Sequence, residues 1–81
     1  MEGMSKIEKV IERMQRNPRD WRIEDLVAIA KRFDIEYRQP GTSHVTFRSP
    51  EGYRVTVPSH KPIKPIYIKN FLSMLENMGV I

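Results

Sequence analysis

The 81-residue chain has no cysteine, few glycines, a single tryptophan and no apolar run of transmembrane length. The absence of cysteine excludes disulfide bonds and thiolate chemistry. The absence of a long apolar run argues against a membrane-spanning helix. Nothing near Met1 has the form of a basic segment followed by an apolar signal core. We therefore expect a cytoplasmic protein that does not associate with a membrane.

The short length limits how much apolar surface can be buried. A chain of this size buries only about 60% of the surface that its unfolded form exposes, which is enough for one thin core between two layers. We expect a single compact domain, in which residues 1–20 form an N-terminal helical extension and residues 21–81 form the main unit.

Acidic residues are scarce in the second half of the chain. Residues 41–70 carry five basic side chains against Glu51 alone, and this excess equals the net charge of +4 of the whole chain. A positive field concentrated in one region attracts a polyanion, and nucleic acid is the commonest one in the cytoplasm. A solvated basic surface without a ligand is the alternative interpretation.

Residues 41–58 have the pattern of a β-hairpin. Apolar residues recur with period two in two runs, and residues 49–52 between the runs have turn chemistry. Val45, Phe47, Val55 and Val57 are therefore predicted on one face. The opposite face receives the polar side chains of both strands, which are His44, Thr46, Arg48, Arg54 and Thr56.

Three helices are predicted around the strands. Residues 5–8 have the form of a capping box, which begins a first helix that stops at Asn17-Pro18. Asp20 is the expected N-cap of a second helix over about residues 21–33. Pro65 is well placed in the first turn of a third helix, and Gly79 is its expected terminator. Trp21 is expected in the core rather than stacked on a base.

A third strand is predicted before the hairpin, because residues 35–38 alternate apolar with charged and residues 39–41 have turn chemistry. The fold class is therefore α+β, with helices on one face of a three-stranded antiparallel sheet. We expect Tyr37, Phe47 and Val55 on the covered face and the last helix packed against it. The other face stays open to solvent and includes Glu36.

The order of these segments resembles the HicA family of toxin ribonucleases. The resemblance covers about residues 22–78 and is carried by the helix ending in Phe33, the GTSH segment at 41–44, Phe47, the turn at 50–52, the VTVPSH segment at 55–60 and Lys64-Pro65. It implies a double-stranded-RNA-binding-like α-β-β-β-α core, to which residues 1–20 add a helix. It also implies a toxin-antitoxin system, in which the toxin is an endoribonuclease that cleaves mRNA and is held in check by a HicB-like antitoxin.

In the HicA family the histidine after the glycine-serine segment is catalytic, and His44 occupies that place. The resemblance thus implies that His44 is a general acid/base. Such a group typically contributes 10²- to 10⁴-fold, and an imidazole with an ordinary pKa of about 6.5 exchanges protons near neutrality. The candidate substrate-binding residues are Ser43, Thr46, Arg48, Arg54, His60, Lys61 and Lys64.

No cofactor is expected, because RNA supplies its own nucleophile in the 2′-hydroxyl. A metal site is not expected either, since there is no cysteine and the two histidines lack a metal-binding spacing. Two other functions stay open. One is a noncatalytic RNA- or DNA-binding module that uses the basic sheet edge, with His44 as a contact only. The other is a protein-interaction domain whose helices bind a partner.

Overall fold

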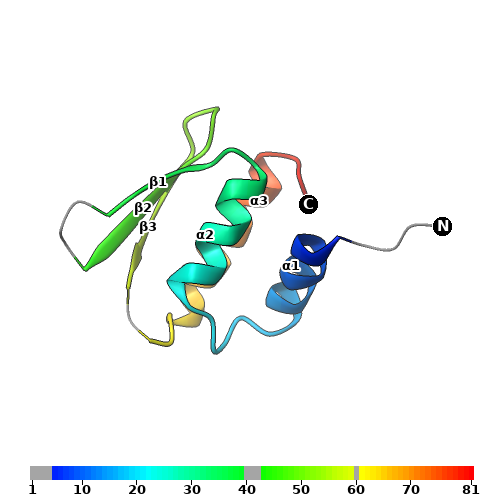
Figure 1. The fold of residues 1–81 in the computed structure, drawn as a ribbon, viewed down its shortest axis with the longest axis vertical. Coiled ribbons are helices and arrows are strands. Elements are labelled where there is room, and N and C mark those ends of the chain that lie inside the picture. The colour runs from blue at the N-terminus through cyan, green and yellow to red at the C-terminus, as the bar shows by residue number, and fades with distance from the viewer. Residues whose placement is uncertain (1–4, 40–42, 60) are drawn as a thin grey trace.

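The computed structural model describes residues 5–39, 43–59 and 61–81. The order of elements is α1 (Lys6–Arg16), α2 (Ile23–Arg32), β1 (Glu36–Arg38), β2 (His44–Arg48), β3 (Arg54–Pro58) and α3 (Pro65–Asn77). The strands form one antiparallel sheet in the order β1-β2-β3. Helices α2 and α3 lie on one side of the sheet, and α1 lies beyond them (Figure 1). This is the predicted α+β architecture.

The covered face of the sheet forms one core with the helices. Phe47 of β2 is fully buried, and its ring meets that of Phe71 of α3 edge-on at a centroid distance of 5.1 Å. Val45 and Val57 beside it are also buried. The period-two prediction for the covered face of the hairpin is therefore confirmed.

Helix α1 packs against α2 and α3 rather than projecting from them. Its Ile11 and Met14 are buried and belong to the same core as the sheet residues. The indole N–H of Trp21 donates to the carbonyl of Asn17 at 2.7 Å, and Arg13 lies over the indole ring at 5.7 Å from its centroid. Trp21 is buried, as predicted, and it joins the first helix to the rest of the core.

The prediction for the covered face was only partly correct at the two edge strands, β1 and β3. Tyr37 lies opposite Phe47 in the register and its ring is 6.3 Å from the phenylalanine ring, so it is on the predicted side. The tyrosine is nevertheless 41% exposed, and Val55 is half-buried. Tyr37 and Val55 belong to the two edge strands, where the core covers a side chain from one direction only.

The hairpin turn fixes the pairing of β2 with β3. The N–H of Gly52 donates to the carbonyl of Ser49 at 3.0 Å, and Gly52 has a φ of +99°, which a residue with a side chain rarely adopts. The buried Ser49 hydroxyl accepts a further bond from the N–H of Tyr53 at 3.0 Å. The turn predicted at residues 49–52 is confirmed, and it sets Arg48 directly opposite Arg54.

The predicted N-cap of the second helix was wrong. Asp20 has a φ of +64° and lies outside α2, whose N-cap is Arg22. The N–H of Arg22 donates to the carboxylate of Asp25 at 3.0 Å, so an acid inside the first turn binds the N–H of the N-cap residue. The predicted capping box at Ser5, by contrast, is confirmed, with reciprocal bonds to Glu8 of 2.8 and 3.1 Å.

Within the part of the chain that the structure describes, no helix is both long enough and apolar enough to cross a membrane.

Candidate nucleic-acid interface

The face of the sheet turned away from the helices is polar and basic. We call it the open face. Successive side chains of β2 point to opposite faces of the sheet, and those with even numbers point away from the core. The register places even-numbered residues of β1 and β3 beside them. The open face consists of Glu36, Arg38, His44, Thr46, Arg48, Arg54 and Thr56.

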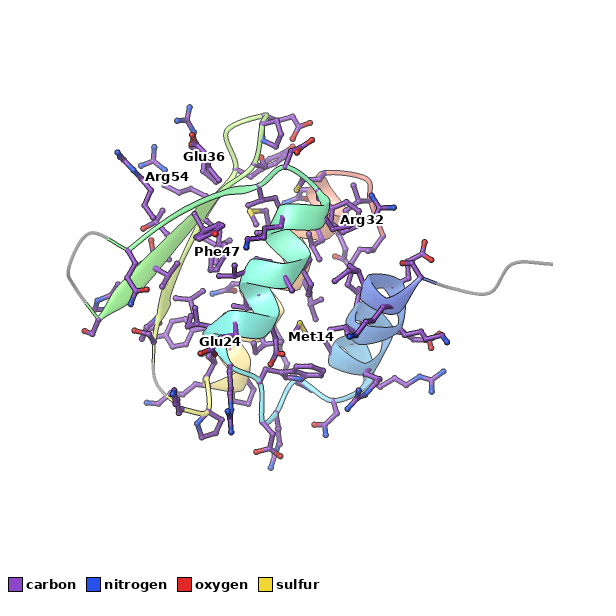
Figure 2. All side chains as sticks on the ribbon, viewed as in Figure 1. Met14, Glu24, Arg32, Glu36, Phe47 and Arg54 are labelled. Atoms are coloured by element: carbon purple, nitrogen blue, oxygen red, sulfur yellow. The ribbon has the colours of Figure 1, made fainter. Side chains whose placement is uncertain are left out.

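Three arginines gather at one end of the open face. Arg38, Arg48 and Arg54 line a hollow of about 270 Å³ together with Glu36 and Thr46. Figure 2 shows Arg54 and Glu36 at this end of the sheet, pointing away from the helices. Each of the three strands contributes at least one side chain, so the hollow exists only when the sheet is assembled.

This arginine cluster has little internal charge compensation. Arg48 and Arg54 are direct cross-strand neighbours, and like charges in such a pair are destabilising. Among the described residues, no carboxylate lies within 4.0 Å of the cationic nitrogens of Arg38, Arg48 or Arg54. A bound anion would relieve this repulsion, because guanidinium groups bind phosphate through charge-assisted, frequently bidentate hydrogen bonds.

His44 lies at the other end of the open face, with its side chain exposed. It is four residues from Arg48 along β2, a separation of about 13 Å at the usual rise per residue. The carbonyl of Ser43 accepts two bonds from Ser59, from its N–H at 2.7 Å and from its hydroxyl at 2.9 Å. These bonds join the residue after β3 to the residue before His44.

A basic loop, residues 61–64, follows β3 at the end of the sheet where β2 begins with His44 (Figure 1). Its Lys61 and Lys64 are exposed on either side of Ile63, which is buried and donates its N–H to the carbonyl of Trp21 at 2.9 Å. The backbone can place Lys61 no farther than about 11 Å from Pro58, the residue that pairs with His44. His60, predicted as a substrate-binding residue just before this loop, lies outside the described residues.

The structure therefore divides the predicted substrate-binding residues into two groups. Arg48 and Arg54 belong to the arginine cluster, and Lys61 and Lys64 belong to the basic loop near His44. Thr46 lies between the ends, and its hydroxyl is 3.3 Å from that of Thr56. Ser43 is exposed, and the contacts described for it are made by its carbonyl.

Sequence reasoning missed Arg38 as a member of the site. The signal was present, because Arg38 is two residues after Glu36 and the two residues share a face in an extended strand. Arg38 precedes residues 41–70, in which the basic excess lies. Its position opposite Thr46, in the same hollow as Arg48, depends on the pairing of β1 with β2, which the hairpin pattern alone does not specify.

No group of three or more histidine, cysteine or acidic side chains that could hold a metal ion occurs in the ranges 5–39, 43–59 and 61–81.

No family model matches the chain, and neither a curated protein nor a solved structure is significantly similar to it. The fold and the site together define a small α+β domain whose sheet has one helix-covered face and one open face rich in arginine.

Proposed function

We propose that this protein is an endoribonuclease toxin of the HicA type, which cleaves mRNA without a metal ion and uses His44 as general acid/base. The observation that supports this proposal best is the composition of the open face. One imidazole lies about 13 Å along β2 from a cluster of three arginines, and Glu36 is the only acid in the three strands. Such a surface attracts a polyanion and offers it a group that transfers protons.

The order of elements also supports the HicA resemblance. The run α2-β1-β2-β3-α3 has the α-β-β-β-α order of a double-stranded-RNA-binding-like core, with α1 as the additional helix. In this proposal the protein acts in the cytoplasm, and its partner is a HicB-like antitoxin that holds the nuclease in check.

In the proposed reaction, an RNA strand lies along the open face with phosphates held by the arginine cluster at one end and by Lys61 and Lys64 at the other. His44 lies at the same end as Lys61 and Lys64 and removes the proton of a ribose 2′-hydroxyl. The oxygen attacks the adjacent phosphorus, a P–O bond to the 2′-oxygen forms, and the bond to the 5′-oxygen of the next nucleotide breaks. The histidine returns the proton to this leaving oxygen. Guanidinium or ammonium groups stabilise the additional charge on the phosphorane.

The test uses two RNA oligonucleotides that differ at one position. The first is all RNA, and the second carries a 2′-deoxynucleotide on the 5′ side of the bond that is cleaved in the first. We expect scission of the first, with a 2′,3′-cyclic phosphate at the new end and no effect of EDTA, and no scission of the second at that bond. Cleavage of the deoxy-substituted bond would exclude attack by the 2′-hydroxyl.

A noncatalytic RNA- or DNA-binding module is the second candidate. It is supported by the arginine cluster, which binds phosphate equally well whether or not His44 performs chemistry. A mobility shift of the all-RNA oligonucleotide, without products after prolonged incubation, would favour this candidate over the nuclease.

A further inference from the structure

The outer edge of β3 carries backbone groups that, among the described residues, pair with no other strand. β3 is the last strand in the order β1-β2-β3. In an antiparallel pair, residues that exchange hydrogen bonds alternate with residues that do not. The bonds at the two ends of the hairpin show which pairs are the hydrogen-bonded ones. The N–H of Ser59 donates to the carbonyl of Ser43 at 2.7 Å, and the N–H of Ser49 donates to the carbonyl of Tyr53 at 2.8 Å.

The alternation of hydrogen-bonded and non-hydrogen-bonded pairs determines which backbone groups of β3 face β2 and which face the outer edge. Val55 and Val57 exchange bonds with β2, whereas the N–H and C=O groups of Arg54 and Thr56 point to the outer edge. Pro58 follows in the same direction and has no N–H, so it limits the edge at that end. By the same alternation the outer edge of β1 presents the backbone groups of Tyr37 alone. The β3 edge is therefore the longer template for another strand.

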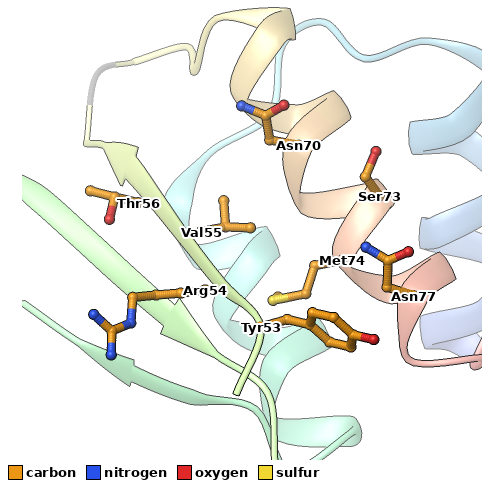
Figure 3. Close-up of a pocket in the computed structure, with 8 residues that line it drawn as sticks. All are labelled: Tyr53, Arg54, Val55, Thr56, Asn70, Ser73, Met74 and Asn77. Atoms are coloured by element: carbon orange, nitrogen blue, oxygen red, sulfur yellow. The ribbon is translucent and has the colours of Figure 1, made fainter. Parts of the chain in front are cut away.

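A groove of about 350 Å³ runs between this edge and α3 (Figure 3). Asn70, Ser73 and Asn77 of α3 recur at helical spacing, are exposed and line the groove on the helix side. Val55 and Met74 supply apolar surface between the helix and the strand. A polypeptide in the groove would thus meet unpaired backbone on one side and amide and hydroxyl groups on the other.

The charges on the open face indicate which strand would fit. Glu36, Arg48 and Arg54 lie in one row across β1, β2 and β3, so two arginines are adjacent and only the first has an acidic neighbour. The next position in this row, beyond Arg54, would belong to a fourth strand. An acidic residue there would form a favourable cross-strand pair with Arg54. A second copy of the chain fits less well, because antiparallel pairing of two β3 strands about Thr56 sets Arg54 against Pro58, and two chains of net charge +4 repel.

We propose that the β3 edge binds an extended acidic segment of a partner protein, which adds as a fourth strand with an acidic side chain opposite Arg54. Main-chain hydrogen bonds to Arg54 and Thr56 would supply the affinity, and the acidic residue would supply the specificity. Strand addition at β3 does not depend on cleavage by His44, so a protein without nuclease activity would still bind the segment.

The test uses a short capped peptide in which valine alternates with threonine and a central residue is glutamate. Titrated into ¹⁵N-labelled protein, it should shift the amide signals of Arg54 and Thr56 and protect these amides from hydrogen exchange, while Val55 and Val57 keep the protection they already have. Replacement of the glutamate by lysine should weaken binding about tenfold, because a favourable cross-strand pair becomes a repulsive one.

Two peptides of identical sequence provide the sharpest control. N-methylation of the glutamate removes the N–H that faces Arg54, whereas N-methylation of the adjacent valine removes an N–H that faces away. The first should abolish binding and the second should leave it within about threefold. In the protein, Thr56→Pro removes an outward N–H that no described strand uses, so the fold should survive and the peptide should no longer bind.

Equal binding of the two methylated peptides would overturn the proposal, and so would peptide-induced shifts that avoid Arg54 and Thr56. Protection of these two amides that rises with protein concentration in the absence of peptide would assign the edge to a second copy of the chain. Protection by an RNA oligonucleotide but not by the peptide would assign it to nucleic acid. Either result would also overturn strand addition by an acidic partner.

Discussion

The two faces of the sheet share the same strands but have opposite compositions. On the covered face, Val45, Phe47 and Val57 are at most 1% exposed, and helices pack on them. On the open face, Arg48 and Arg54 are exposed as direct neighbours of like charge, which costs stability. Alternation along each strand thus places odd-numbered residues on the covered face, which packs against the helices, and even-numbered residues on the polar, basic open face. Substitutions at adjacent positions should therefore have separable effects.

The largest effect on stability is expected at the centre of the covered face. Phe47→Ala should lower the free energy of unfolding by about 3–5 kcal/mol, because the ring is fully buried against Phe71. The matched control is Tyr37→Ala, which removes the paired but 41% exposed ring and should cost about 1 kcal/mol. Urea unfolding measures both, and equal losses would contradict the assignment of the core.

The next effect tests whether α1 is integral to the domain. Met14 is fully buried where α1 meets the rest of the core, so Met14→Ala should cost about 2–5 kcal/mol. Gln15→Ala changes the adjacent exposed residue and should alter stability by less than about 0.5 kcal/mol. If Met14→Ala were as mild as Gln15→Ala in thermal unfolding, residues 1–20 would be a dispensable extension.

Neutralising the arginine cluster should separate binding from stability. We expect the double variant Arg48→Gln, Arg54→Gln to bind RNA more weakly and to lower the log–log salt slope by about 1.4, since each lost phosphate contact on a single strand removes about 0.7. Relief of the like-charge pair should at the same time raise stability by up to about 1 kcal/mol. A variant that is less stable and binds RNA as tightly as the wild type would contradict both roles.

The basic loop should show the smallest change. Neutralising Lys61 and Lys64 to glutamine should also weaken RNA binding and flatten its salt dependence, with no change in stability beyond about 0.5 kcal/mol because both side chains are exposed. Lys6→Gln with Lys9→Gln removes the same charge from the exposed surface of α1 and serves as the control. An equal salt slope for the two double variants would show that the loop does not contact RNA.

The open face could be predicted well from the sequence where it depends on local geometry. Period two in residues 44–48 and 54–57, with a turn at 49–52, specified which side chains of the hairpin share a face. What depends on neighbours in space was harder to predict. Arg38 joined the cluster through the register of β1 with β2, and Tyr37 stayed exposed because β1 is an edge strand.

The start of one helix could be predicted from the sequence, and the start of another could not. Ser5 caps α1 through contacts within four residues, and that prediction was confirmed. Asp20 was an equally plausible cap by residue type, but α2 begins later, at Ile23, its N-cap is Arg22, and Asp25 in the first turn accepts the N–H of Arg22. Several residues near a helix start are suited by type to be the N-cap, and residue type alone does not fix the residue at which the helix begins.

The central claim, that His44 performs the proton transfers, is tested most directly by the single-turnover cleavage rate of His44→Ala at saturating protein. The rate should fall at least about 10²-fold, while RNA affinity and the free energy of unfolding stay close to those of the wild type, because the side chain is exposed and the phosphate contacts remain. Gln15→Ala, on a helix away from the open face, should cleave at the wild-type rate. A folded His44→Ala protein that cleaves RNA as fast as the wild type would contradict the mechanism.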